Sequence, residues 1–368
     1  MDEIITYPAC NPEFMSLLDI LRAALSGKGE IRQQNFAPVI AEARRQTVDG
    51  IILSFLAGKS LLPPEEKMRA IARILALEKA NTTANQHVVL LVRLLEANGI
   101  RHAVMKGQTV ARFYPNPQLR IPGDIDVYVA ERDFRQACLL LEEQGYTKTD
   151  FTMLHATYSK KGCTEVELHF AVQKLQWLPH FRSLQRITRK NVDNAKPHYT
   201  VIAGERIPVL PPCMETVLLT VHAFNHVLNG GLGLRQVLDW MLGVQCLEKD
   251  IDKTALVTML ADTGMTKMFR TLYYICSRHL GMSLDATAWN STGLLHVTDK
   301  DEETGRKLIY WIGEAGNFGH SLNLSKTQYY LLFLKNCWRF RRLNRKEMFV
   351  YPFMKIKRLI TGENHLRK

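Results

Sequence analysis

The sequence lacks any pair of cysteines at the spacing of a metal site. Its seven cysteines are scattered singly over 368 residues, and no CxxC pair occurs. This pattern argues against a cysteine-ligated metal centre and is typical of isolated, buried thiols in a reducing compartment. Because 46% of the residues are hydrophobic, we expect the fold to rest on its hydrophobic core rather than on disulfides.

Long apolar runs are also missing. No stretch approaches the roughly 18 consecutive apolar residues of a membrane-spanning helix. Asp2 and Glu3 stand where a secretory signal would carry positive charge. The sequence contains no internal repeat and no low-complexity tract. These absences predict a cytoplasmic protein without a transmembrane segment.

Positive charge is concentrated in residues 326–368. The net charge is +12, and this segment contains 12 Lys or Arg and two Glu, so the rest of the chain is close to neutral. The run from Trp338 to Lys346 mixes aromatic and basic side chains, which is typical of a surface that contacts nucleic acid or an anionic membrane. Two simpler interpretations of this segment remain open: it forms a solvent-exposed helix face, or its aromatic residues pack on the rest of the protein.

Hydrophobic periodicity divides the chain into three regions. Apolar residues three and four positions apart predict a helical region over residues 1–99, where Pro64 and the two following glutamates mark a helix start. Residues 100–212 alternate short β-rich runs with a few helices, and residues 213–368 return to the helical pattern. The predicted fold class is therefore α+β, with a central α+β module between two helical regions.

The central module contains several predicted strands and one well-marked helix. The helix covers residues 131–144 and ends at Gly145. The strands are predicted at residues 103–106, 124–129, 146–149, 152–158 and 165–170, followed by a hairpin at 199–209 that turns at Gly204.

Two aspartates share one face of a predicted strand. In the run from Asp124 to Val129, strict alternation places Asp124 and Asp126 on one face and three aliphatic residues on the other. The two carboxylates lie about 7 Å apart along such a strand. A divalent cation that bridges them would offset their repulsion, because Mg²⁺ prefers carboxylate, phosphate and water oxygens.

A second acidic strand supplies a third carboxylate. Alternation places Glu165, Glu167 and His169 on one face of the strand at 165–170. If the two strands are neighbours, three acids converge as two-metal phosphoryl or nucleotidyl transfer requires. We interpret Glu165 as a solvated neighbour, whereas His169 either contacts the substrate or is a buried, hydrogen-bonded histidine.

A glycine at a predicted strand-to-helix junction suggests a phosphate site. Gly107 follows the first strand, where backbone amides can approach a phosphate at the helix N-terminus. Lys106 is a further candidate for the triphosphate, as is Arg120, which lies in the loop before the aspartates.

These motifs together resemble those of the uncharacterised nucleotidyltransferase family, a branch of the polymerase-β-like superfamily. The resemblance rests on Lys106-Gly107, Arg120, the Asp124-Ile125-Asp126 run and the Glu167-Leu168-His169-Phe170 strand. It extends to a helix with His222 and His226 that leads to Arg235 and Asp239, and so covers the chain up to about residue 250.

The resemblance implies a mixed-sheet nucleotidyltransferase module in which Asp124, Asp126 and Glu167 are catalytic and bind Mg²⁺ or Mn²⁺. Gly107 would begin the phosphate-binding turn. Gln108 departs from the pattern, since the superfamily usually has Gly or Ser there, and it would replace that contact to the nucleotide.

The working hypothesis is transfer of a nucleoside monophosphate from a nucleoside triphosphate such as ATP to a hydroxyl group on a small molecule, protein or nucleic acid. His169, His222, Arg235 and Asp239 are candidates for the acceptor pocket. A simpler role for His222 and His226 is packing against the catalytic module. A simpler role for Arg235 and Asp239 is an ion pair between residues four positions apart on one helix. Two alternative functions are a non-catalytic nucleotide- or nucleic-acid-binding module, and a peripheral membrane or partner-docking protein that acts through the basic tail.

Overall fold

The computed structural model describes residues 11–27, 31, 35–229, 231–316 and 325–361. Cys10, the rest of the first ten residues and the end of the basic tail at 362–368 lie outside this part. The fold is 63% helical with one mixed sheet, which confirms the predicted α+β class. No helix in the described ranges is both long enough and apolar enough to cross a membrane.

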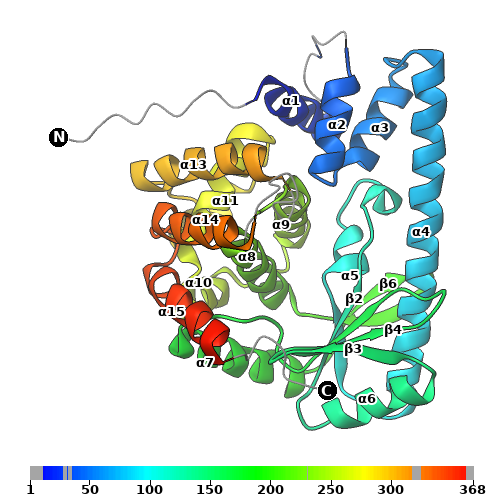
Figure 1. The fold of residues 1–368 in the computed structure, drawn as a ribbon, viewed down its shortest axis with the longest axis vertical. Helices are drawn as coiled ribbons and strands as arrows, with labels where there is room; N and C mark the ends of the chain where they lie inside the picture. The colour runs from blue at the N-terminus through cyan, green and yellow to red at the C-terminus, as the bar shows by residue number, and fades with distance from the viewer. Residues whose placement is uncertain (1–10, 28–30, 32–34, 230, 317–324, 362–368) are drawn as a thin grey trace.

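The N-terminal part of the chain is helical, as predicted. Its helices are α1 (Pro12–Ser26), α2 (Ala37–Arg45), α3 (Asp49–Gly58) and α4 (Pro64–Ala97). Helix α4 begins at Pro64 with acidic residues in its first turn, as the sequence indicates. It is long enough to run along one side of the molecule and reach the sheet (Figure 1).

Seven strands form a single mixed sheet. They are β1 (His102–Met105), β2 (Ile125–Val129), β3 (Thr147–Phe151), β4 (His155–Ser159), β5 (Val166–His169), β6 (His198–Ile202) and β7 (Glu205–Val209). Their spatial order is β3-β4-β5-β2-β1-β7-β6. The β2–β5 and β1–β7 pairs are parallel and the others are antiparallel. The predicted β6–β7 hairpin is present and turns at Gly204, whose φ is 81°.

The prediction of a strand at residues 152–158 is wrong at its start. The hydroxyl of Thr152 accepts hydrogen bonds from the backbone amides of Leu154 and His155. This local turn replaces the sheet ladder, so that β4 begins only at His155. The helix predicted at 131–144 is α6 (Phe134–Glu143), and Gly145 follows it with a φ of 79°.

The two faces of the sheet differ as the alternation predicts. Ile125, Val127, Val166 and Leu168 pack in one hydrophobic cluster with residues of α4 and α6. Tyr128, from the opposite face of β2, belongs instead to the large cluster that includes the C-terminal helices. The face that carries the acidic residues is therefore turned toward the helical half of the molecule.

Short helices frame the strands. They are α5 (Gly107–Ala111) and η1 (Pro117–Leu119) between β1 and β2, and α7 (Leu178–Thr188) with the π-helical turn η2 (Arg189–Asp193) after β5.

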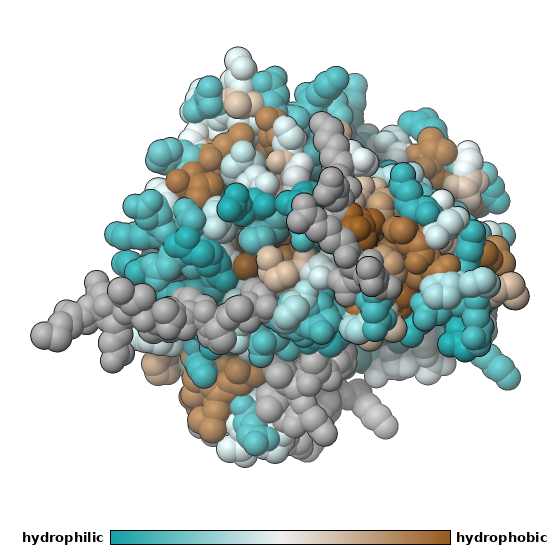
Figure 2. Space-filling view, turned by 90° about the horizontal axis from the view of Figure 1, so that it is seen from above, coloured by the Kyte–Doolittle hydropathy of each residue, from teal (hydrophilic) through white to brown (hydrophobic). Residues whose placement is uncertain are grey.

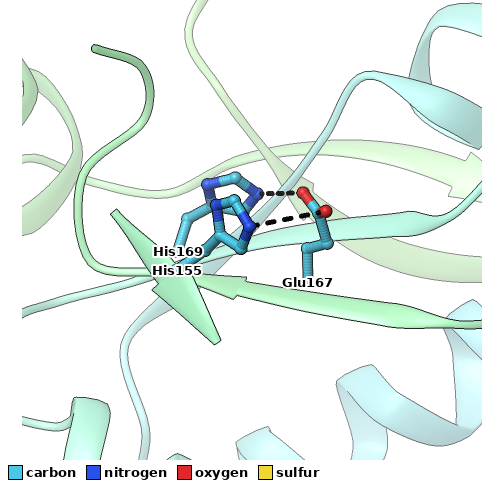
Figure 3. Close-up of side chains that lie close together, drawn as sticks. All are labelled: His155, Glu167 and His169. Atoms are coloured by element: carbon cyan, nitrogen blue, oxygen red, sulfur yellow. Dashed lines mark hydrogen bonds and ion pairs between the residues drawn. The ribbon is translucent and has the colours of Figure 1, made fainter. Parts of the chain in front are cut away.

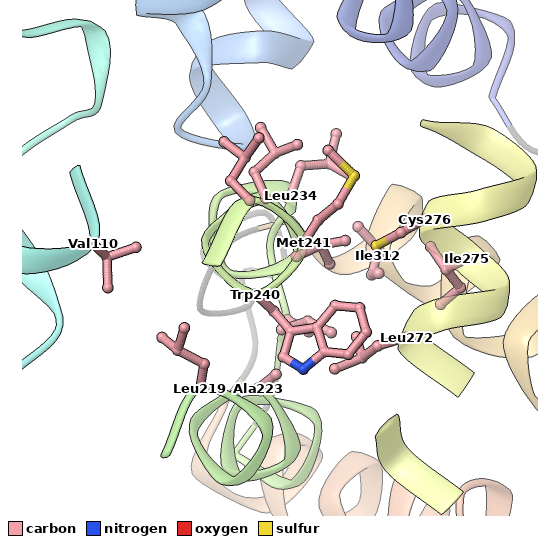
Figure 4. Packing of buried hydrophobic residues seen from close by; sticks show 14 of the residues in the cluster. Val110, Leu219, Ala223, Leu234, Trp240, Met241, Leu272, Ile275, Cys276 and Ile312 are labelled. Atoms are coloured by element: carbon pink, nitrogen blue, oxygen red, sulfur yellow. The ribbon is translucent and has the colours of Figure 1, made fainter. Parts of the chain in front are cut away.

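The C-terminal half is a helical bundle. Its helices are α8 (Pro212–Leu228), α9 (Leu234–Leu247), α10 (Lys253–Asp262), α11 (Thr266–His279), α12 (Ala286–Trp289), η3 (Asn290–Thr292), α13 (Asp299–Ala315), α14 (Lys326–Arg339) and α15 (Arg345–Thr361). Trp240 lies at the centre of the cluster that these helices build (Figure 4). Its indole nitrogen donates to the hydroxyl of Thr220 at 2.9 Å, so that its one polar group is satisfied.

Helices α14 and α15 are partly structural. Phe333 of α14 and Met348 of α15 are buried, as are Phe340 and Leu343 in the link between the helices, whereas Trp338, Phe349 and Phe353 are strongly exposed. The basic segment therefore packs on the body through some of its apolar residues and presents others to solvent.

The cysteines were expected to be isolated, buried thiols, and the structure agrees with this expectation only in part. All six cysteines in the described ranges are free thiols, but Cys246 is exposed, so the expectation that every thiol is buried is wrong.

The surface of the molecule is mixed in hydropathy. On the face that lies at the top in Figure 1, hydrophobic residues form separate patches among hydrophilic ones (Figure 2).

Candidate active site

Three carboxylates converge on the face of the sheet that looks toward the helical bundle. Strands β2 and β5 pair in parallel with Asp126 opposite Glu167, and Asp124 directly precedes β2. One carboxylate oxygen from each of the three residues lies within 4.8 Å of the others. The structure thus brings together the residues that the sequence selects.

Asp126 is the buried centre of this cluster, with a side chain only about 4% exposed. Its Oδ1 accepts a hydrogen bond from Lys106 Nζ at 2.5 Å and lies 2.8 Å from His169 Nε2. Burial alone would raise the pKa of Asp126, but the charge of Lys106 and the hydrogen bond with His169 outweigh it and hold the pKa below its ordinary value. Asp126 therefore stays ionised.

Asp124 is the exposed member of the cluster. The negative charge of Asp126, followed by burial of the carboxyl group, raises the pKa of Asp124 to about 6. Repulsion between neighbouring carboxylates of this kind is what a bound cation relieves. The electrostatics therefore favour a cation beside Asp124.

Glu167 faces two histidines that lie close together on one side of its carboxylate (Figure 3). Its Oε2 is 3.1 Å from His169 Nε2, and its Oε1 is 3.5 Å from His155 Nε2. Burial would raise the pKa of Glu167, but the hydrogen bond with His169 outweighs it and the pKa is lowered. His155 was not selected from the sequence. Its place on the acidic face follows from its register opposite His169 in the neighbouring strand, which the predicted strand at 152–158 does not reveal by itself.

Gly107 forms a strand-to-helix turn directly beside the aspartates. Its φ is 37°, and a Cβ atom at this position would lie 3.2 Å from the backbone oxygen of Asp124. Lys106 just before it also has a positive φ, of 51°. The turn is thus held in a conformation and at a distance that favour glycine, and it lies where the phosphate cradle is predicted.

Comparison with known proteins identifies the family. The model of a family described as uncharacterised nucleotidyltransferase matches residues 32–281. The chain belongs to this family. The crystal structure of an antigenic nucleotidyltransferase-like protein from Paracoccidioides brasiliensis is similar over 57% of this chain and 97% of that chain, with 16% sequence identity and a TM-score of 0.36. Among curated proteins, none matches.

In this family member the side chain of Gln108 is directed to α4. Its Nε2 donates to Asn85 Oδ1 at 2.6 Å and to Asn81 Oδ1 at 3.2 Å. Asn81 Nδ2 in turn donates to the backbone oxygens of Gln118 and Arg120. This amide network ties α4 to the turn and to the loop before the aspartates.

Arg120 forms a buried, bidentate ion pair with Asp239 of α9. Its Nε and Nη2 each donate to one carboxylate oxygen at 2.8 Å. The hydroxyl of Tyr114 donates to the same carboxylate at 2.6 Å. Asp239 thus pairs with Arg120 rather than with Arg235, whose Nη1 reaches the backbone oxygen of Ile121 at 3.4 Å. The simpler interpretation of Arg235 and Asp239 as partners within one helix is wrong.

His222 and His226 of α8 form a contact pair. Their Nε2 atoms are 3.2 Å apart, and His222 Nδ1 lies 3.3 Å from the amide of Gln173. Burial, then the neighbouring His226 and the charge of Lys106, lower the pKa of His222 well below its ordinary value. Of the metal-compatible groups found in the described residues, neither contains His222 or His226. The pair therefore meets as neutral imidazoles.

The neutral state of His226 predicts a specific pH dependence. Burial, and then the charge of Arg235, lower the pKa of His226 from 6.5 to about 4. The unfolded chain consequently binds this proton more readily than the folded one, so stability is fully present above pH 6.5 and is lost as the pH falls toward 4. Between pH 7 and pH 5 the loss from this group is about 2 kcal/mol.

Urea unfolding at pH 7, 6 and 5 measures this loss as the difference between the wild type and the His226→Asn variant. The difference is needed because other buried groups, such as Glu215 with its pKa raised to about 7, shift stability in the opposite direction. Parallel pH curves for the two proteins would show that His226 does not contribute.

Proposed function

We propose that this chain transfers a nucleoside monophosphate from a nucleoside triphosphate to a hydroxyl group of an acceptor, with the help of divalent cations. The observation that carries the proposal is the convergence of Asp124, Asp126 and Glu167 beside the Gly107 turn. Membership of a nucleotidyltransferase family supports it.

The donor set fits hard divalent cations. Asp124 and Asp126 would hold the cations and Glu167 would complete the set, because oxygen donors this close together suit Mg²⁺ or Mn²⁺. When bound, the cations would neutralise charge that develops on the transferred phosphate. The acceptor oxygen bonds to the α-phosphorus as the bond to pyrophosphate breaks, and Glu167 takes the hydroxyl proton.

Lys106 and the Gly107 turn are proposed to bind the triphosphate. Lys106 Nζ already lies at the carboxylate cluster, 2.5 Å from Asp126, so its ammonium group is available to a phosphate bound beside the aspartates. Gln108 and Arg120 are proposed to act on the nucleotide through the backbone that they fix, since their side chains bond to α4 and α9. His169, His222, Arg235 and Asp239 would border the acceptor side.

The decisive experiment incubates the full chain with each triphosphate labelled at the α-phosphate, with Mg²⁺ or Mn²⁺, alone and with cell extract. The proposal predicts labelled acceptor together with released pyrophosphate. The non-catalytic alternative predicts that metal and nucleotide together raise the melting temperature while no pyrophosphate appears. No change in melting temperature with any triphosphate would reject both.

We also propose that α14 and α15 dock on an anionic lipid surface. Between them lies a groove of about 770 Å³, lined by apolar side chains and by Arg341, Arg345 and Lys346. Trp338, 71% exposed, sits under the Arg341 guanidinium at 4.1 Å. Exposed aromatic and aliphatic residues among cations fit the boundary between headgroups and acyl chains.

Sedimentation with vesicles of phosphatidylserine and phosphatidylcholine tests this docking. Binding is expected to fall as salt rises and to drop at least about thirtyfold in Arg341→Glu/Arg345→Glu, since each of the two lost cations contributes about 1 kcal/mol near an anionic surface. Arg69→Glu, an exposed charge on α4, is the matched control. Binding to single-stranded nucleic acid but not to vesicles would overturn the proposal.

A further inference from the structure

Two histidines meet the third carboxylate of the candidate active site. His155 of β4 and His169 of β5 are register partners in the sheet, and their rings lie 4.7 Å apart between centroids. Both direct Nε2 toward the carboxylate of Glu167 (Figure 3). One ligand atom from each of the three residues lies within 4.8 Å of the others.

The spacing suits a shared cation. Ligand atoms bound to one metal at about 2.0–2.2 Å are separated by about 3.0–3.5 Å in octahedral or tetrahedral arrangements. The two nitrogen–oxygen distances around Glu167 are 3.1 and 3.5 Å. Because 3.5 Å is long for a hydrogen bond, contact with Glu167 alone does not account well for the position of His155.

The chemistry of this group differs from that of the aspartates. Asp124 and Asp126 offer only oxygen, which Mg²⁺ accepts readily. His155 and His169 offer imidazole nitrogen, which suits Zn²⁺, Mn²⁺ and other transition metals better than Mg²⁺. Glu167 belongs to both groups. The cluster therefore presents two adjoining cation positions with different donor atoms.

We propose that His155, Glu167 and His169 form a transition-metal subsite next to the oxygen-only position of the two aspartates. The inference deepens the proposed function and rests on it in one respect, namely that the aspartates receive a metal–nucleotide complex. The two nitrogen donors of the subsite, His155 and His169, are not required as metal ligands by the proposed reaction, whereas Glu167 is shared between the two positions.

Charge indicates the order of binding. When both imidazoles are neutral, as metal ligands must be, Asp124, Asp126 and Glu167 together with Lys106 carry a net charge of −2. One divalent cation balances this charge, and a second needs the phosphates of the nucleotide. The transition metal is therefore expected to bind without nucleotide, and Mg²⁺ to arrive with the triphosphate.

The test uses the full chain stripped of metal by chelation. Calorimetry should give at least about tenfold tighter binding of Mn²⁺ or Zn²⁺ than of Mg²⁺ in the absence of nucleotide. Pulsed electron paramagnetic resonance of bound Mn²⁺ should show coupling to imidazole nitrogen. His155→Ala should remove one coupling and weaken Mn²⁺ binding about tenfold or more. His198→Ala, which changes an exposed histidine of β6, should have no effect.

His155 is the informative position because it contacts Glu167, whereas His169 contacts Asp126 as well as Glu167. Mn²⁺ binding without nitrogen coupling, or equal Mn²⁺ affinity in His155→Ala and wild type, would overturn the inference. If a magnesium–nucleotide complex still stabilises the protein in that case, the proposed function survives. Nitrogen coupling without any nucleotide effect would instead keep the subsite and reject the transferase.

Discussion

Asp126→Asn is expected to lower turnover by at least about a thousandfold, because a neutral amide is a poor ligand for Mg²⁺ and the transferred phosphate loses charge stabilisation. The same change should lower the free energy of unfolding by about 3 kcal/mol, since it leaves the ammonium group of Lys106 in a buried site without its carboxylate. Turnover with labelled triphosphate and urea unfolding measure the two effects.

Asp124→Asn separates catalysis from stability. Asp124 is exposed, and the charge of Asp126 raises its pKa, so removal of its own charge relieves repulsion and should leave stability unchanged or slightly higher at pH 8. Turnover should nevertheless fall as it does in Asp126→Asn. Glu165→Gln, a neighbouring exposed acid, is the control. Equal stabilisation by metal and nucleotide in wild type and both aspartate variants would mean that these residues are not the metal site.

Arg120→Ala should lower the free energy of unfolding by about 3–5 kcal/mol, because it leaves the buried carboxylate of Asp239 without its partner. The pair joins the loop before the aspartates to α9, so that catalytic geometry should suffer as well. Guanidinium unfolding of Arg120→Ala, Asp239→Ala and the double variant measures the coupling between them.

An exposed ion pair provides the comparison. Arg93 contacts Glu205 at 2.5 Å with both side chains about half exposed, and Arg93→Ala should cost less than about 1 kcal/mol. Similar losses for Arg93→Ala and Arg120→Ala, or additive losses in the Arg120/Asp239 double variant, would contradict the role assigned to the buried pair.

Much of the site was predictable because strand alternation is a local property. The period of two alone assigns Asp124 and Asp126 to one face and Ile125 and Val127 to the other, and packing of the aliphatic residues in a separate cluster agrees. Helix starts and the Gly204 hairpin were predictable for the same reason, since proline and glycine restrict the backbone where they stand.

Contacts between distant segments were not predictable. The sequence does not reveal that α9 brings Asp239 to Arg120 across 119 positions, so the structural role of Arg120 was not predicted beside its proposed role at the nucleotide. Gln108 looked like a nucleotide contact for a similar reason, since Asn81 and Asn85 belong to a helix whose docking depends on tertiary packing. His155 was missed although its strand was predicted, because the sequence does not reveal that β4 pairs with β5 in the register that sets His155 opposite His169.

The parallel pairing of β2 with β5 makes the active centre a late product of folding. His169 follows Asp126 by 43 positions, and the intervening chain contains α6 and the β3–β4 hairpin, so the pairing of β2 with β5 closes a long loop. Closing such a loop lowers chain entropy, and only the contacts of the completed sheet offset this cost. During refolding, helical circular dichroism should therefore return before metal affinity does, and a nascent chain that has not yet emerged beyond β5 would contain the aspartates without being able to assemble the metal site.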